Sequence, residues 1–168
     1  STPSPAGNGI RFTLTVPDVN LPSVSSRTMT GAGTAKKEDE IETVDILVFD
    51  ASKTPAVYLE WVTATGVTQD LADNSTVSFS AKLPFTTAST CIVVVANREL
   101  DDIVSGFKKG VTTKVEAMEK MLHTQTGKWL ADGSTTGGYT RIPMYGEKVI
   151  SKITPSMDPI TGINMKRM

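Results

Sequence analysis

The sequence has few of the residues from which most active sites are built. It contains a single cysteine, Cys91, and a single histidine, His123. One cysteine excludes an internal disulfide and a cysteine-rich zinc site, and one histidine leaves no set of metal ligands. Cys91 lies in an apolar run and is interpreted as a small buried side chain, and His123 as a residue at a helix end. The sequence therefore predicts no catalytic residue, no metal site and no cofactor, and the chain is not expected to be an enzyme.

Excess charge of one sign and long apolar stretches are also absent. Seventeen Lys and Arg stand against eighteen Asp and Glu, and no basic run with interleaved aromatics is present, which excludes nucleic acid as the expected partner. No apolar stretch reaches the roughly 18 residues of a membrane span. The Pro- and Gly-rich residues 1–9 resemble neither a signal peptide nor a transit sequence. An export signal, where one is encoded, is expected upstream of residue 1.

Polar clusters along the chain give no strong indication of a binding site. The carboxylates within residues 38–42 are typical of a solvated charge run. Asp70, Asp73 and Asn74 offer oxygen ligands but lack the spacing of an EF-hand loop, so calcium is only a weak alternative. Residues 31–33 contain two glycines without the helix start or lysine of a phosphate-binding loop.

What the sequence does contain is a series of short strands. Apolar and polar residues alternate over residues 10–16, which predicts a strand with one buried face formed by Ile10, Phe12, Leu14 and Val16. Residues 17–40 follow as a long Ser-, Thr-, Pro- and Gly-rich connection, and a connection of this length is either functional or mobile. The continuous apolar run in residues 41–50 predicts a central strand covered on both faces.

Further strands are predicted over residues 57–64, 76–83, 90–96, 142–149 and 160–168. One helix interrupts them, because Thr113 and Glu116 have the spacing of a capping box. Its apolar face is predicted to contain Val115, Met118, Met121 and Leu122. The Gly-rich residues 127–138, which include Trp129, are expected to form a loop that is less ordered than the strands. We predict one domain, a mainly β Greek-key β-sandwich with one short helical insertion.

Several segments together resemble the fimbrillin family of Bacteroidales, the subunits of type V pili. The resemblance covers nearly the whole chain, and its most specific parts are the strand that ends in Phe49-Asp50 and the stretch Ile142-Pro143-Met144-Tyr145-Gly146-Glu147. The other parts are the strand at residues 10–16, the Ser26-Arg27-Thr28 segment, and residues 93–98. The resemblance implies a transthyretin-like sandwich, with residues 1–168 as an N-terminal domain and a C-terminal domain beyond this chain.

The same resemblance implies how such a subunit assembles. Fimbrillins are exported as lipoproteins, and an Arg-specific protease removes an N-terminal strand whose groove is then filled by a strand of the next subunit. Transferred to this chain, the strand at residues 10–16 is removable, its plug residues are Ile10, Phe12, Leu14 and Val16, and the cut falls between Arg27 and Thr28. The implied partners are other pilus subunits, the maturation protease and a host or bacterial surface ligand, with membrane contact only through a lipid anchor upstream of this chain.

The residues themselves are compatible with this assembly and leave alternatives open. A strand followed by a long polar connection can be cut and lifted out without breaking a tight hairpin, which leaves an unpaired edge and an apolar trough. Without the resemblance, Arg27 is an ordinary loop arginine. A glycan-binding lipoprotein of the outer membrane is the alternative function, and its only candidate aromatic residues are Tyr58, Trp61, Trp129 and Tyr139. Both functions predict a cell-surface location, and neither separates a shaft, tip or anchor subunit.

Overall fold

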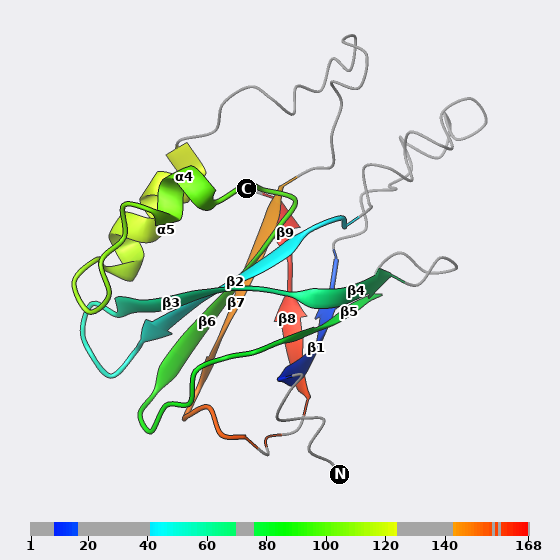
Figure 1. Cartoon of the computed structure of the whole chain (residues 1–168), viewed down its shortest axis with the longest axis horizontal. Helices are drawn as coiled ribbons and strands as arrows, with labels where there is room; N and C mark the ends of the chain where they lie inside the picture. The colour runs from blue at the N-terminus through cyan, green and yellow to red at the C-terminus, as the bar shows by residue number, and fades with distance from the viewer. Residues whose placement is uncertain are drawn as a thin grey trace, which may run out of the picture.

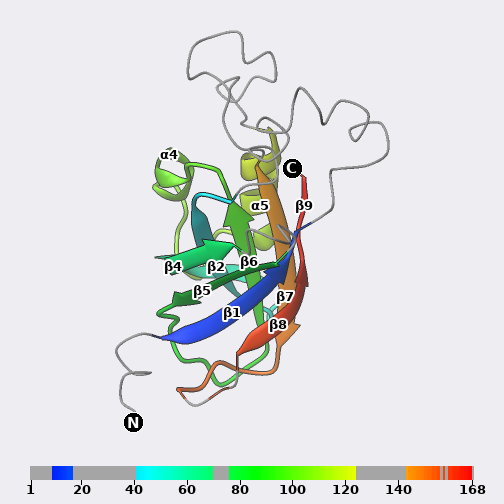
Figure 2. The ribbon, with the colours of Figure 1, turned by 90° about the vertical axis from the view of Figure 1, so that its right-hand side faces the viewer.

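The computed structural model describes residues 9–16, 41–69, 76–123, 143–155, 157 and 159–167. Within these ranges the strands form two sheets, shown in Figures 1 and 2. Sheet A has the order β4-β5-β1-β8, and sheet B has the order β3-β2-β6-β7-β9. The elements are β1 (Ile10–Thr15), β2 (Val44–Asp50), β3 (Val57–Thr63), β4 (Thr65–Gln69), β5 (Thr76–Ala81), β6 (Thr90–Ala96), α4 (Asp101–Val104), α5 (Lys114–His123), β7 (Met144–Ile150), β8 (Ile160–Asn164) and β9 (Lys166–Arg167).

The two sheets pack face to face around one apolar core. Alternate residues along the strands point into it, as the period of two requires, and they include Phe12 and Leu14 from β1, Phe79 from β5 and Ile46 from β2. Strands β2 and β6 lie in the middle of sheet B and are buried along almost their whole length. This confirms the prediction that the apolar run in residues 41–50 is a central strand covered on both faces.

The second face of sheet B is covered by the helices, which Figure 1 shows beside β3, β2 and β6. Leu47 and Phe49 of β2 point to this side and pack in a second apolar cluster with Ala117 and Met121 of α5. The molecule therefore has three layers: sheet A, sheet B and the helices.

Helix α5 starts where the sequence predicted it. The Thr113 hydroxyl accepts from the Glu116 N–H at 3.1 Å, and the Glu116 carboxylate accepts from the Thr113 N–H at 3.0 Å, which is the reciprocal pair of a capping box. The predicted apolar face was wrong at Val115, whose side chain is 64% exposed. Ala117 and Met121, one turn apart, are the residues fully buried against the sheet.

The structure confirms the predicted mainly β sandwich with a helical insertion, and it adds three details. Strand β4 and helix α4 had not been predicted. The strand expected over residues 160–168 is two strands, because the chain passes at the buried Met165 from sheet A to sheet B, where β9 pairs with the start of β7. Within the described residues, neither helix has the length and apolar character needed to cross a membrane.

Candidate functional site

The candidate site is the position that β1 occupies inside sheet A. Figure 2 shows β1 between β5 and β8. It pairs antiparallel with β5 over six residues, from Ile10 opposite Ala81 to Thr15 opposite Thr76. On its other side it pairs in parallel with β8, with an irregularity between Phe12 and Leu14. Because β1 is an inner strand, both of its backbone edges are occupied by neighbours that lie far away in the sequence.

The inward side of β1 is formed by the four residues predicted to be buried. Ile10, Phe12, Leu14 and Val16 are 6, 1, 0 and 2% exposed. The Phe12 ring stacks on the ring of Phe79 in β5, with a centroid distance of 4.9 Å and an interplanar angle of 11°. The predicted alternation of β1 is therefore confirmed, since Arg11 and Thr15 on the other face are exposed. The four inward side chains fill space between the two sheets.

A glycine at the entry to β1 lets the chain approach β5 closely. Gly9 has a φ of +85°, and a Cβ on it would lie 2.2 Å from the carbonyl oxygen of Ala81. Any other residue would meet both the backbone of β5 and an unfavourable φ. Sequence analysis did not single out Gly9, although a glycine directly before an alternating strand is a signal for such close approach.

Strand β8 is held in sheet A through β1. Its ladder partners are residues of β1, and the Met165 N–H donates to the Thr15 carbonyl at 2.8 Å. Beyond the sheet, β8 contacts β7, where a Cβ on Gly146 would lie 2.7 Å from the Asn164 carbonyl oxygen and where the Lys148 ammonium donates to the Thr161 carbonyl. Without β1, the backbone hydrogen-bonding groups along one edge of β5 and one edge of β8 would both be unpaired.

Several predicted site residues lie outside the described residues. They are the cleavage candidates Arg27 and Thr28, the whole connection over residues 17–40, the loop over residues 127–138, and Trp129, Tyr139, Asp70, Asp73 and Asn74. The ends of the connection are described: β1 lies in sheet A and β2 in sheet B, so the connection passes from one sheet to the other. His123 is the last residue of α5, the helix-end position expected from the sequence.

The two described aromatic candidates for glycan binding belong to the layer between sheet B and the helices. Tyr58 is buried and makes edge contacts with Phe49 and Phe107. The Trp61 indole N–H donates to the Asp45 carboxylate at 3.1 Å. Neither residue presents an exposed ring on which a sugar could stack.

Burial shifts the pKa values of two side chains in sheet B, Cys91 and Asp45. Burial raises the pKa of the Cys91 thiol to about 11, which keeps it protonated at neutral pH. Burial also raises the pKa of Asp45, against the hydrogen bonds from Trp61 and Thr63 that lower it. In the same ranges, no three metal-ligating side chains lie close enough to hold an ion.

Comparison with known proteins identifies the family. No curated protein matches the chain. The model of the family described as major fimbrial subunit protein (FimA) matches residues 10–161. The matched range begins at the first residue of β1, includes every described element from β1 to β7 and ends at the second residue of β8, so it covers β1 and most of both sheets. The chain belongs to the FimA family of major fimbrial subunits, a family of structural proteins of the cell surface.

Proposed function

We propose that this chain is a structural subunit of a cell-surface fimbria and that it joins its neighbours by strand exchange at the position of β1. An Arg-specific protease cuts between Arg27 and Thr28, β1 leaves, and an extended strand of another subunit takes its place. Adhesion to a host or bacterial surface is then a property of the assembled fibre. The observation that carries the proposal is the placement of β1 between β5 and β8, where a vacated position offers hydrogen-bonding groups on both sides.

The energetics of the position support replacement of β1 rather than its simple loss. Full burial of a side chain such as Phe, Leu, Ile or Val contributes about 1.5–3 kcal/mol, so the four inward side chains of β1 contribute about 6–12 kcal/mol. This is a gross burial term, from which the entropy cost of ordering and binding a strand is subtracted. The apolar side chains of β1 therefore favour a trough that a new strand refills over one that stays open to water.

The chain connectivity supports the release of β1 after cleavage. Its ladder partners β5 and β8 are both remote in sequence, and residues 17–40 separate it from β2 in the other sheet. A cut in this connection leaves β1 attached only by non-covalent contacts. No hairpin has to be broken to release it.

Limited digestion followed by peptide exchange tests the proposal. An Arg-specific protease should cut first after Arg27, which stands among small polar residues, and mass spectrometry of the first fragment identifies the bond. A labelled peptide of residues 9–16 should then exchange into the cut protein but not into the intact protein. A peptide with Ser in place of Phe12 and Leu14 is the matched control and should not be retained, because it lacks the two largest inward side chains.

Two results would contradict the proposal. The first is initial cleavage at another arginine, with the Arg27→Lys variant cut as fast as the natural chain. The second is a cut product that neither takes up the peptide nor self-associates in sizing experiments. In that case β1 would be an ordinary core strand.

A further inference from the structure

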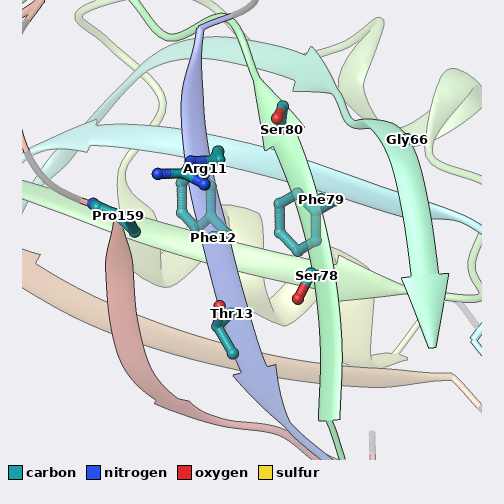
Figure 3. Close-up of a pocket in the computed structure, with 8 residues that line it drawn as sticks. All are labelled: Arg11, Phe12, Thr13, Gly66, Ser78, Phe79, Ser80 and Pro159. Carbon is teal, nitrogen blue, oxygen red and sulfur yellow. The ribbon is translucent and has the colours of Figure 1, made fainter. Parts of the chain in front are cut away.

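Strand β8 faces β5 across the position that β1 occupies. Figure 3 shows this arrangement, with Phe79 of β5 on one side of β1 and Pro159, at the start of β8, on the other. Because β1 runs antiparallel to β5 and parallel to β8, strand β8 runs antiparallel to β5. Neighbouring strands lie about 4.7–4.9 Å apart, so β8 and β5 are separated by about two such spacings. Once β1 has left, β8 has a direction that allows it to pair with β5.

Closure of β8 onto β5 would compete with strand exchange. It would pair the two free edges with each other and leave no position for a strand of another subunit. A position that is emptied and then refilled therefore requires contacts that hold β8 away from β5. These contacts must not belong to β1, because β1 is the strand that leaves.

Two contacts with β7 of sheet B hold β8, one near each of its ends. Near the start of β8, the Lys148 ammonium donates to the Thr161 carbonyl oxygen. Near its end, β8 lies against the backbone of Gly146. A Cβ at that glycine would be 2.7 Å from the Asn164 carbonyl oxygen and 2.8 Å from Cγ2 of Ile163. Only the lack of a side chain at position 146 allows this close approach.

The chain that follows β8 anchors it to sheet B as well. Met165 is 3% exposed and belongs to the core between the two sheets. Directly after it, β9 pairs with β7, with Lys166 opposite Tyr145 and Arg167 opposite Met144. The contacts of Lys148, Gly146 and β9 involve no residue of β1, so they do not depend on its presence.

We propose that Lys148 and Gly146 are positioning residues for strand exchange. They hold β8 two strand spacings from β5, so that the position vacated by β1 stays open for a strand of another subunit. This inference rests on the proposed function. Lys148 is the residue to substitute, because its side chain is partly exposed, whereas Gly146 is too closely packed to accept any side chain.

A pair of engineered cysteines detects closure of the gap. Thr76 of β5 and Asn164 of β8 both lie opposite Thr15 of β1, on its two sides. Two strand spacings, roughly 9–10 Å, exceed the limit of about 7 Å between Cα atoms for a disulfide. Thr76→Cys with Asn164→Cys should therefore crosslink only when β8 moves to β5. The natural Cys91 is buried and does not compete.

The cysteine pair is oxidised in the cut chain under the conditions in which the labelled peptide of residues 9–16 exchanges. Crosslinking should be slow with the natural Lys148. With Lys148→Met, which keeps an apolar side chain but no donor, it should be about three- to tenfold faster, the factor expected for the loss of one hydrogen bond. Lys148→Arg keeps a donor and should restore slow crosslinking. Lys152→Met, at an exposed position after β7, is the matched control and should change nothing.

Two further readouts complete the test. The intact chain should not crosslink, because β1 separates the two cysteines, and thermal unfolding checks that each variant folds. The crosslinked chain should no longer take up the peptide. Equal crosslinking rates with Lys148 and Lys148→Met, or peptide uptake by the crosslinked chain, would overturn this inference alone. A natural cut chain that exchanges no peptide would instead remove strand exchange itself, and this inference with it.

Discussion

Replacement of Phe12 by alanine tests whether the inward side chains of β1 stabilise the sandwich core, as their burial indicates. The ring is 1% exposed and stacks on Phe79. Removal of a buried Phe side chain from a core costs about 3–5 kcal/mol, and a stacked aromatic pair contributes about 0.5–1.5 kcal/mol beyond its buried area. We expect the free energy of unfolding to fall by about 3–5 kcal/mol, a large share of the roughly 5–15 kcal/mol of a typical domain.

Thermal and urea unfolding of the uncut chain measure this loss. In a domain of this size, 1 kcal/mol shifts the melting temperature by about 2–4 °C, so Phe12→Ala should lower it by about 6–20 °C. The urea midpoint should fall with an unchanged slope, because the surface exposed on unfolding stays nearly the same. Thr15→Ala, at an exposed position of the same strand, is the control and should stay within about 0.5 kcal/mol of the natural chain.

A double-mutant cycle with Phe79→Ala isolates the contact between the two rings. The coupling energy should be about 0.5–1.5 kcal/mol if the rings stack. The reasoning is refuted if Phe12→Ala destabilises no more than Thr15→Ala, because β1 would then contribute no core. It is also refuted if the two substitutions are strictly additive, because the rings would then not interact.

Two further predictions concern the helical layer and the thiol. Thr113→Ala should destabilise the protein by about 1 kcal/mol and speed amide exchange in the first turn of α5, whereas Thr113→Ser should retain the capping box with Glu116. No change in that exchange would show that the box is not formed in solution. Cys91, with its pKa raised to about 11, should resist alkylation at pH 8 in the folded protein and react rapidly in urea. Equal labelling in both states would contradict its burial.

Local patterns in the sequence predicted those elements whose stability is local or whose burial is complete. The apolar runs inside β2 and β6 indicated strands covered on both faces, because successive side chains point to opposite faces and are apolar on both. The alternation of apolar and polar residues in β1 predicted which face of the strand points inward, since a slip of one residue would expose four apolar side chains. The capping box fixed the start of α5, because both of its hydrogen bonds are made within one turn.

The features that escaped prediction depend on contacts that no local pattern encodes. Strand β4 has the sequence Thr-Gly-Val-Thr-Gln, with one apolar side chain, and its backbone pairing with β5 is what makes it a strand. Val115 fits an apolar helical face by spacing, but the face of α5 that packs on sheet B contains the predicted Met121 together with Ala117, which was not predicted.

The neighbours of β1 also constrain the direction of any strand that replaces it. A strand that runs as β1 does pairs antiparallel with β5 and parallel with β8. A strand that runs the other way would make its parallel ladder with β5, the neighbour that offers the longer and more regular edge. Antiparallel pairing is slightly more stable per residue, so the longer ladder favours the direction of β1. Under the proposed strand exchange, successive subunits would then follow one another in a single sense, because each inserted strand repeats the orientation of the strand that left.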